Sequence, residues 1–379
     1  MGRRRVCFVT GSRAELGLMR TALEAIAAHP KLTLQIVVTG MHLDRAHGRG
    51  LAAIRGEGWN IDAVVPWAAG SGAGGTELAA ATGRAMAGIS RALARLKSDI
   101  VLVTGDRVEA FAAAAAGHLC GRIVAHVHGG DRAAGQVDDS LRHAITKLSH
   151  IHFPATRQSA RRIARLGEDR WRIHCVGAPG NDGIRASAAE WPQVIQCVPG
   201  LRKRRYCVVV LHPCDGDAMV ERRRAEAVFR ATRQAGFVRI VIVYPNNDPG
   251  CQGIIRCWKR QEQRPGVTAF RDLPRGVYLG LLRHAAVLVG NSSSGIIEAP
   301  ALGVPVVDVG NRQQGRQRSG TVVHSSYNVG DIRRAIRRAI RSRTAAANIY
   351  RGQGAGARIA KVLAAATLDD RLRRKLISY

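Results

Sequence analysis

The sequence alternates short apolar runs with longer amphipathic runs, and it does so in two successive rounds. In the first round Val6–Val9 and Ile100–Val103 predict buried strands, and Leu78–Leu96 carries the periodicity of a helix. The pattern restarts at Cys207–Leu211 and continues with Ile240–Val243. Strands that alternate with helices in this way form parallel sheets with helices on both faces. We therefore expect an α/β chain made of two similar doubly wound halves.

The size of the chain also favours two domains. With 379 residues it exceeds the usual size of a single hydrophobic core, about 250–300 residues. A hydrophobic content of 46% with only 4% aromatic residues indicates a core of Ala, Val, Ile and Leu. The turn-rich segment Ala178–Gly183 fits a linker. We expect an N-terminal domain over residues 1–178, a C-terminal domain over 179–365 and a tail or helix over 366–379.

Neither a membrane segment nor a secretory context is expected. No apolar run approaches the roughly 20 residues of a membrane span, and Thr10–Arg13 ends the first apolar run after four residues, as in a strand and not a signal peptide. The eight cysteines contain no CxxC pair, and several lie in apolar runs, as small buried hydrophobes of a reducing compartment do. We expect a cytoplasmic protein without a membrane partner.

The formal net charge of +30 admits a polyanionic partner. The arginines, however, are spread along the chain without interleaved aromatic residues. In the helical run Asp331–Ile340, the apolar residues Ile332, Ile336 and Ile340 share one face, which leaves the arginines on the solvated face. We therefore expect no specific nucleic-acid partner, but a positive field that attracts a small anionic ligand.

A glycine- and serine-rich turn is the strongest functional signal. The apolar run Ala286–Val289 predicts a strand, and Gly290-Asn291-Ser292-Ser293-Ser294-Gly295 leads from it into a helix. Backbone N–H groups and hydroxyls at a helix N-terminus suit a phosphate or diphosphate. Glu298, about one turn further on, could accept hydrogen bonds from sugar hydroxyls. A serine-rich helix cap without a ligand is the alternative interpretation.

Other polar side chains also follow predicted strands. Arg13 is placed to meet a phosphate, Asp106 and Arg107 follow Ile100–Val103, and His212 follows Cys207–Leu211. Asp106 could be a base or only a helix cap. Because ligands of doubly wound folds bind at the carboxyl ends of the strands, we expect these side chains to meet in one interdomain cleft.

The segment from His126 to Asp139 carries two histidines and three carboxylates within fourteen positions. These groups are His126, His128, Asp131, Asp138 and Asp139, and such a cluster in a cleft suits acid/base chemistry. Histidines with aspartates could instead bind a metal ion, but the spacings match no standard ligand pattern, so we expect no metal. Asp139 or Ser140 could instead cap the following helix.

In these residues the sequence resembles the hydrolysing UDP-N-acetylglucosamine 2-epimerases, and within them the sialic-acid-pathway branch. The resemblance runs nearly end to end, and its longest matching segments are Arg142–His150 and Gly290–Pro300. Further matching elements are Thr10–Glu15, Thr39–Leu43, Gly105–Arg107, His128–Gly130, Asp138–Leu141, Val176–Gly180, His212-Pro213, Pro245–Asp248 and Gly310–Gln313.

The resemblance implies two Rossmann-like domains of the glycosyltransferase-B-like type, with the active site in the interdomain cleft and the nucleotide on the C-terminal domain. It implies no cofactor, neither metal nor nicotinamide, and a homo-oligomer, either dimer or tetramer. The implied reaction eliminates UDP from a UDP-sugar by removing the proton at C2, and then hydrates the resulting 2-acetamidoglucal to N-acetylmannosamine.

The resemblance also assigns roles to single residues. Asp106 matches a catalytic carboxylate, Asp138 and Asp139 match a carboxylate pair, and His212 matches a histidine near the diphosphate. Substrate-binding roles carry over to Arg13, His42, Arg107, His128, Asn247, Ser292, Ser293, Ser294, Glu298 and Arg312. His128 stands where several relatives carry a glutamate, which leaves Asp131 as the nearest replacement for that acid/base group.

Three alternatives stay open from the sequence. A non-catalytic sugar-nucleotide binder is favoured only if the departure at His128 disables proton transfer. A sister activity on UDP-N,N′-diacetylbacillosamine would leave the motifs around the nucleotide unchanged, since both substrates carry UDP. A retaining glycosyltransferase could use the same fold, but it would need an acceptor.

Overall fold

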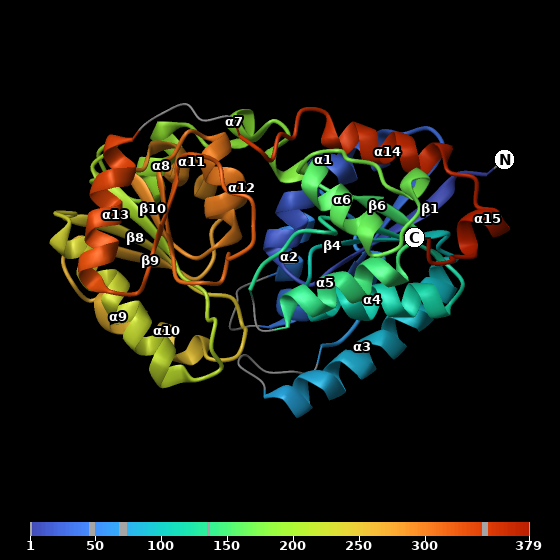
Figure 1. Ribbon diagram of the computed structural model, residues 1–379, viewed down its shortest axis with the longest axis horizontal. Coiled ribbons are helices and arrows are strands. Elements are labelled where there is room, and N and C mark those ends of the chain that lie inside the picture. Colours follow the sequence, from blue (N-terminus) through green and yellow to red (C-terminus); the bar gives the residue numbers. More distant parts are fainter. Residues whose placement is uncertain (1, 45–49, 68–73, 135–136, 343–347, 379) are drawn as a thin grey trace.

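Two six-stranded parallel sheets form the framework of the chain, one in each of two lobes (Figure 1). The computed structural model describes residues 2–44, 50–67, 74–134, 137–342 and 348–378. In both sheets the strands of the lobe follow the same order, third, second, first, fourth, fifth and sixth. This is the strand order of dinucleotide-binding folds, with the point of reversal between the first and fourth strands. The expectation of two similar α/β halves is confirmed.

The first lobe contains β1 to β6 and α1 to α6. Its strands are β1 (Arg4–Thr10), β2 (Leu32–Val38), β3 (Ala63–Val64), β4 (Ile100–Thr104), β5 (Ile123–Val127) and β6 (Ile151–Phe153). Its helices are α1 (Arg13–Ala28), α2 (Gly50–Gly56), α3 (Gly75–Leu96), α4 (Val108–Leu119), α5 (Asp138–Leu148) and α6 (Arg157–Arg165).

The second lobe contains β7 to β12 and α7 to α13. Its strands are β7 (Tyr206–Val210), β8 (Arg239–Val243), β9 (Val267–Phe270), β10 (Val287–Gly290), β11 (Val306–Val309) and β12 (Val322–Ser325). Its helices are α7 (Ile184–Ser187), α8 (Trp191–Cys197), α9 (Ala218–Gln234), α10 (Cys251–Gln261), α11 (Arg275–His284), α12 (Ser293–Ala301) and α13 (Val329–Arg341).

Helices cover both faces of each sheet, so both faces are buried. Successive side chains of a strand point to opposite sides and enter different hydrophobic clusters. In β1, Phe8 packs into one hydrophobic cluster, while Cys7 and Val9 pack into another on the opposite face. In β10, Val289 and Leu288 divide in the same way between two clusters of the second lobe. The central strands therefore read as continuous apolar runs, which is why the sequence located them. The less buried edge strands β3, β9 and β12 were not predicted.

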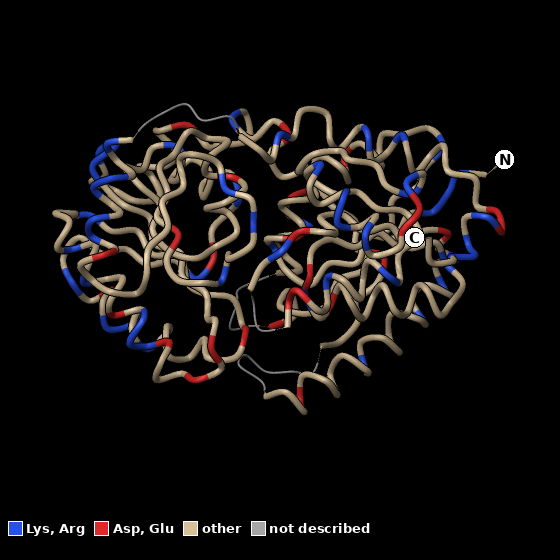
Figure 2. Tube along the Cα trace, in the orientation of Figure 1, with Lys and Arg blue, Asp and Glu red and all other residues tan. Residues whose placement is uncertain are grey.

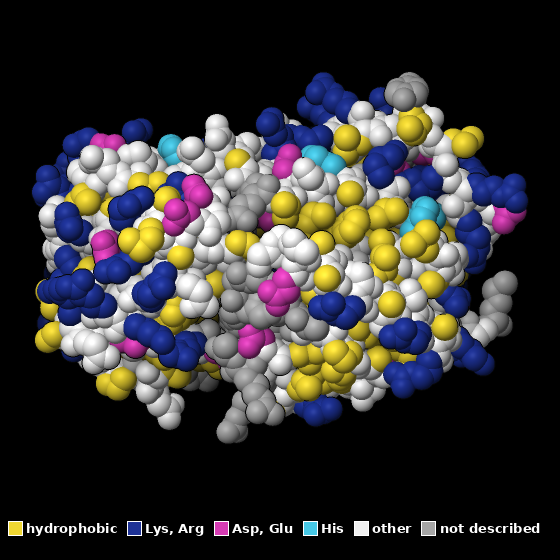
Figure 3. All heavy atoms as spheres, turned by 90° about the horizontal axis from the view of Figure 1, so that it is seen from below, with side chains coloured by type: hydrophobic (Ala, Val, Ile, Leu, Met, Phe, Trp, Pro, Cys, Tyr) yellow, Lys and Arg dark blue, Asp and Glu magenta, His cyan; other side chains and the backbone are white. Residues whose placement is uncertain are grey.

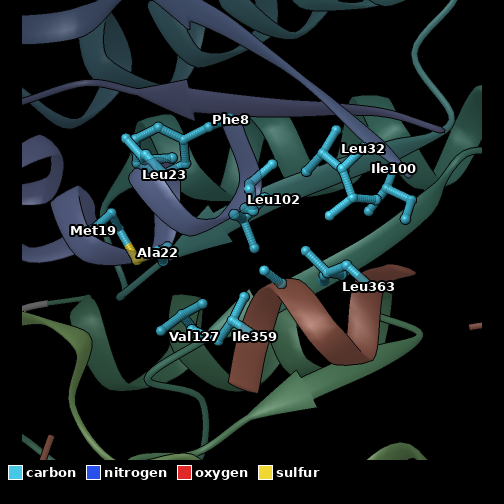
Figure 4. Packing of buried hydrophobic residues seen from close by; sticks show 14 of the residues in the cluster. Phe8, Met19, Ala22, Leu23, Leu32, Ile100, Leu102, Val127, Ile359 and Leu363 are labelled. Carbon is cyan, nitrogen blue, oxygen red and sulfur yellow. The ribbon is translucent and has the colours of Figure 1, made fainter. Parts of the chain in front are cut away.

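The chain returns to the first lobe after completing the second. Helix α14 (Ala355–Ala365) packs against α1, and its Ile359 and Leu363 join the cluster of Phe8 and Leu102 (Figures 1 and 4). The short helix α15 (Asp370–Arg373) follows on the same lobe, where Leu372 joins that cluster. The sequence-based division placed residues up to 365 in the C-terminal domain, whereas the packing of α14 assigns this helix to the first lobe.

A buried carboxylate fixes the last residues to the first lobe. Glu168 is 2% exposed, and its oxygens accept hydrogen bonds from Lys147 Nζ at 2.6 Å and His152 Nε2 at 3.1 Å. Lys375 Nζ, near the C-terminus, lies 2.8 Å from the same carboxylate. Burial alone would raise the pKa of Glu168, but these hydrogen bonds outweigh burial and lower the pKa to about 2.

Positively charged residues are spread over both lobes. Lys and Arg lie along the traces of both lobes, and the face seen from below carries them over both lobes as well (Figures 2 and 3). In α13, Ile332 and Ile336 are buried while Arg337 and Arg338 are exposed, as the periodicity predicted. In the described part of the chain, no helix combines the length and apolarity needed to cross a membrane.

The cysteines follow the expectation only in part. All eight are free, and four of them are buried, namely Cys7, Cys207, Cys251 and Cys257. Three others, Cys120, Cys175 and Cys197, are exposed, because they lie outside the central strands and away from the buried faces of the helices.

Replacing Glu168 tests the polar anchor of the C-terminal residues. Glu168→Gln leaves two partly buried lysines, Lys147 and Lys375, without their charge partner. We expect a loss of roughly 2 to 4 kcal/mol in unfolding free energy at pH 7. The ordinary pKa of Glu is 4.5 and the folded value is about 2, so this contribution is complete above pH 4.5 and is lost as the pH falls toward 2. Denaturant unfolding at several pH values measures both effects.

The matched control is Glu190→Gln, which removes an exposed carboxylate that lies 3.1 Å from Arg283. Its effect should stay within about 0.5 kcal/mol. Equal unfolding free energies for wild type and Glu168→Gln at pH 7 would contradict the anchor.

Candidate active site

A cavity of about 370 Å³ lies between the two lobes. It is lined by residues that follow β1, β4 and β5 in the first lobe and β7, β8 and β10 in the second. The carboxyl ends of both sheets therefore face one cleft, as expected for doubly wound folds. Most of the predicted residues line this cavity, namely Arg13, His42, Asp106, Arg107, His128, His212, Ser292, Ser293, Ser294, Glu298 and Arg312.

The serine-rich turn is shaped by the glycine that ends β10. Gly290 has φ +146°, and a Cβ atom at this position would lie 1.9 Å from the carbonyl oxygen of Val210. Only glycine fits such a conformation at such a close approach. Ser292 caps α12, with its Oγ accepting a hydrogen bond from the backbone N–H of Ser294. The free N–H groups of this helix start form a site suited to an anion.

The turn is tied to the loop after β7. The side-chain oxygen of Asn291 accepts a hydrogen bond from the backbone N–H of His212 at 2.7 Å, and its Nδ2 donates to the carbonyl oxygen of His212 at 2.8 Å. Two neighbouring strands thus present His212 and the serines to the same cavity. A buried asparagine satisfied in this way fixes both loops.

His212 is a neutral hydrogen-bond donor toward the cavity. Burial and the nearby Arg312 lower the pKa of His212 to about 3. The backbone N–H of Asn246 donates to Nδ1 at 3.1 Å, so the ring proton resides on Nε2. This tautomer can donate to an anionic oxygen without carrying a charge itself.

His42 lies on the first lobe, in the short 3₁₀ helix Gly40–Leu43. Its Nε2 lies 3.0 Å from the hydroxyl of Thr10, at the end of β1. Burial and the charge of Arg13 lower the pKa of His42 to about 4, so this imidazole is also neutral near pH 7.

Glu298 forms a buried ion pair at the other end of the serine helix. It is 5% exposed, and Arg275 Nη2 lies 2.7 Å from its Oε1. Tyr278, from the same helix as Arg275, places its hydroxyl 2.6 Å from Ser294 Oγ. Arg275 and Tyr278 were not identified from the sequence, since their positions in the helical run before β10 carry no motif.

Asp106 is paired with a fully buried arginine. The guanidinium of Arg142, from α5, donates to the carboxylate of Asp106. Among the described residues Arg142 Nε and Nη1 have no hydrogen-bond partner, and Arg142 lines the cavity. The alternative that Asp106 caps a helix is wrong, because the N-cap residue of α4 is Arg107. Arg142 was missed as a site residue although it lies in the most specific sequence segment.

Ion pairs connect the lobes across the cleft. Arg107 donates to Asn247 Oδ1 at 2.9 Å and lies 3.5 Å from Asp248. Asn247, for which a substrate-binding role was predicted, thus contacts a residue that lines the cavity. Arg312 Nη2 lies 3.8 Å from Asp138, and Arg13 pairs with Asp272. Burial alone would lower the pKa of Arg107, but Glu109 and Asp248 outweigh it and raise that pKa. The cations of the cleft are thus held by carboxylates of both lobes.

Three predicted carboxylates lie outside the described lining of the cavity. Asp138 and Asp139 form the first turn of α5, whose N-cap residue is Val137, so neither Asp139 nor Ser140 caps this helix. Burial raises the pKa of Asp138. Asp139 accepts a hydrogen bond from the backbone of Ala133, and its position is partly exposed.

Asp131 is buried behind His128. It is 2% exposed, it accepts a hydrogen bond from Ser159 Oγ at 2.7 Å, and its Oδ2 lies 3.7 Å from His128 Nδ1. The other histidine of this segment, His126, is fully buried and lies 2.8 Å from the carbonyl oxygen of Gly105. Within the described residues, no group of three or more His, Cys, Asp or Glu side chains could hold a metal ion.

A protein family described as UDP-N-acetylglucosamine 2-epimerase matches residues 24–364 of this sequence. The chain belongs to this family. It is 35% identical over 336 residues to the UDP-N-acetylglucosamine 2-epimerase of Neisseria meningitidis, covering 89% of this chain and 87% of that relative. It is 34% identical over 338 residues to the UDP-N,N′-diacetylbacillosamine 2-epimerase (hydrolyzing) of Legionella pneumophila, covering 89% of each.

Solved structures of UDP-N-acetylglucosamine 2-epimerases share the fold. A Neisseria meningitidis enzyme bound to UDP-GlcNAc superposes with a TM-score of 0.79, at 17% identity and over 95% of this chain and 99% of that one. The Methanocaldococcus jannaschii enzyme in complex with UDP-GlcNAc and UDP gives a TM-score of 0.76, at 15% identity and over the same shares. The expected glycosyltransferase-B-like arrangement is confirmed.

Glu15 is a further buried polar residue near the cavity of this UDP-N-acetylglucosamine 2-epimerase family member, and a capping-box motif in the sequence could have located it. Ser12 and Glu15 form a capping box at the start of α1, and Glu15 Oε2 accepts the backbone N–H groups of Gly11 at 2.7 Å and Ser12 at 2.9 Å. The spacing of serine and glutamate is the signal that could have located it. Burial, with Glu109 nearby, raises the pKa of Glu15 to about 7.

Gly290→Ala tests the turn that shapes the anion site. The added methyl would meet the Val210 carbonyl, so we expect a loss of more than 3 kcal/mol in stability or failure to accumulate as folded protein. Gly183→Ala is the matched control, because Gly183 also has a positive φ, at +63°, but no atom lies within 4 Å of its added Cβ. This variant should cost only about 1 kcal/mol. Equal melting temperatures for the two variants would contradict the steric argument.

Proposed function

We propose that this chain is a hydrolysing 2-epimerase that converts UDP-N-acetylglucosamine and water to N-acetylmannosamine and UDP, in the formation of sialic-acid-type sugars. The observation that carries the proposal is the cavity itself, in which a carboxylate of the first lobe, Asp106, faces the anion site of the second. Family membership and the Neisseria relative support the UDP-sugar, and the Legionella relative supports hydrolysis.

The leaving group sets the electrostatic demand of this reaction. A departing UDP carries the charge of its diphosphate, and that charge must be met by fixed donors and cations. The start of α12 supplies N–H groups and the hydroxyls of Ser292 and Ser293, and His212 supplies a neutral N–H. Arg142 and Arg316 line the cavity, and each has buried N–H groups without a partner among the described residues. These groups are available to an anionic ligand.

The sugar nucleotide would lie across the cleft. Glu298, which Arg275 holds in place, is suited to accept hydrogen bonds from ribose hydroxyls, and the diphosphate would lie over the serine helix. The sugar ring would then point toward Asp106 and His128 of the first lobe. This orientation brings C1 and C2 to the acid/base groups.

Elimination requires a base beside C2. The carboxylate of Asp106 accepts a hydrogen bond from Arg142, and in the proposed step it takes the C2 proton while the C1–O bond breaks and UDP leaves with the bonding electrons. The product is a 2-acetamidoglucal. In the second step water adds its oxygen to C1 and a proton returns to C2 on the opposite face, which gives N-acetylmannosamine.

UDP-N,N′-diacetylbacillosamine is the second candidate substrate. The Legionella relative has nearly the same identity to this chain as the Neisseria one, at 34% against 35%. Both substrates carry the same nucleotide, so the choice depends on the sugar end of the cavity. A retaining glycosyl transfer would use the same nucleotide site but would need an acceptor sugar.

The products formed in heavy water test the proposal. With UDP-N-acetylglucosamine alone, we expect free N-acetylmannosamine with one deuterium at C2, together with an equal amount of UDP, as seen by NMR. Release of this sugar with water alone would exclude a transferase that needs an acceptor. Turnover of only the bacillosamine nucleotide would replace the proposed substrate, and a product without deuterium at C2 would overturn the elimination.

Asp106→Asn tests the base directly. The variant keeps the size of the side chain but not its basicity, so we expect kcat to fall about 10²- to 10⁴-fold. UDP binding, measured by calorimetry, should stay within a few-fold of wild type because most of the proposed nucleotide groups, Ser292, Ser293, His212 and Glu298, lie on the other lobe. Asp99→Asn, at the amino end of the same strand, is the control and should retain wild-type kcat. A kcat of Asp106→Asn near the wild-type value would refute the role.

A further inference from the structure

His128 occupies a strained position at the edge of the cavity. Its φ is +64°, a left-handed conformation that costs an ordinary side chain roughly 1 kcal/mol or more. Its backbone N–H donates to the carbonyl oxygen of Phe153 at 3.1 Å, so the neighbouring strand holds this conformation. The ring lines the cavity, although the residue is only 6% exposed.

The ring of His128 has one neighbouring acid, and that acid is anchored from behind. Asp131 Oδ2 lies 3.7 Å from Nδ1, and neither ring nitrogen has a hydrogen-bond partner among the described residues. The other carboxylate oxygen of Asp131 accepts the hydroxyl of Ser159 at 2.7 Å, and Thr156 Oγ1 lies 2.9 Å from that hydroxyl. Asp131 thus has one fixed oxygen and one oxygen directed at the imidazole.

We propose that His128 is the acid that returns the proton to C2 in the second step, and that Asp131 is its positioning residue and not itself the proton shuttle. Nδ1 lies toward Asp131, and Nε2, which is also buried and without a partner among the described residues, is the nitrogen available for proton transfer. A carboxylate behind an imidazole fixes its orientation and stabilises the imidazolium, as in hydrolase triads. This inference rests on the proposed function, and it changes the role that the sequence gave to Asp131.

The step balances with the groups present. The π electrons of the 2-acetamidoglucal form the new C2–H bond with the Nε2 proton of the His128 imidazolium. The oxygen of water forms the bond to C1, and the proton that this water loses restores the imidazolium. Asp106 takes no part in this step, so the two faces of C2 are served by two different groups.

The partition between two products tests this assignment. The variant His128→Asn is suitable because asparagine tolerates a left-handed conformation. For His128→Asn and Asp131→Asn with UDP-N-acetylglucosamine, we expect UDP release within about tenfold of wild type. The sugar released should be mainly 2-acetamidoglucal instead of N-acetylmannosamine, because only the second step has lost its acid. NMR of the products and a coupled UDP assay measure both quantities.

Three controls separate chemistry from folding. Lys97→Asn changes another left-handed residue, with φ +50°, away from the described lining of the cavity, and should release only N-acetylmannosamine. His128→Gly removes the side chain and the strain together, and added imidazole should restore N-acetylmannosamine formation. Asp131→Glu keeps the charge and should restore part of the wild-type product ratio.

The outcomes are distinct for the two proposals. Only N-acetylmannosamine from His128→Asn and Asp131→Asn would overturn the inference, as would loss of UDP release without any glycal while the melting temperatures stay unchanged. A wild-type enzyme that releases neither UDP nor N-acetylmannosamine from this nucleotide would instead overturn the proposed function.

Discussion

The direction of the strands is the constraint on which the rest of this structure depends. Both sheets are parallel, have the same strand order and turn their carboxyl ends toward one cavity. Parallel strands need crossover connections, and in the described residues a loop and a helix follow every strand except β11, which leads to β12 without a helix. Asp106 follows β4, His212 follows β7 and Ser292 follows β10. Residues far apart in the sequence therefore lie close together, because the carboxyl ends of parallel strands meet at the same edge of each sheet.

Burial shifts the pKa values of the histidine and arginine side chains that line the cleft. Burial lowers the pKa values of His42 and His212, so these two imidazoles are neutral near pH 7. Arginines pair with carboxylates, as Arg142 does with Asp106 and Arg107 with Glu109. Burial lowers the pKa of Arg142, whereas Glu109 and Asp248 outweigh burial and raise the pKa of Arg107. The ion pairs between the lobes are partly exposed, and each contributes at most about 1 kcal/mol. The cleft is therefore rich in oriented donors that are held loosely enough to exchange partners with an anion.

The sequence predicted what depends on local pattern. The strands were visible as apolar runs buried on both faces, and the glycine and serines after β10 were visible because a strand-to-helix turn needs them. The sequence could not predict that α14 packs on the first lobe, since its apolar face fits any core and only the tertiary structure selects one. Arg275 and Asp272 were missed for the same reason, because each acquires its role from a partner in another element.

Asp131 was predicted from the sequence to be a catalytic residue, but the structure places it outside the described lining of the cavity. Its acidity suited a direct role, yet the turn at His128 and Gly130 places the histidine at the cavity and the aspartate three residues later behind it. Backbone strain at a non-glycine residue persists only where the surrounding structure enforces it, and such strain concentrates at functional sites. At this position the strand end, the left-handed turn and the hydroxyl of Ser159 all fix the same pair. In the proposed reaction an imidazole backed by a carboxylate would serve one face of the sugar carbon while Asp106 serves the other, so that inversion at that carbon would use two separately placed groups.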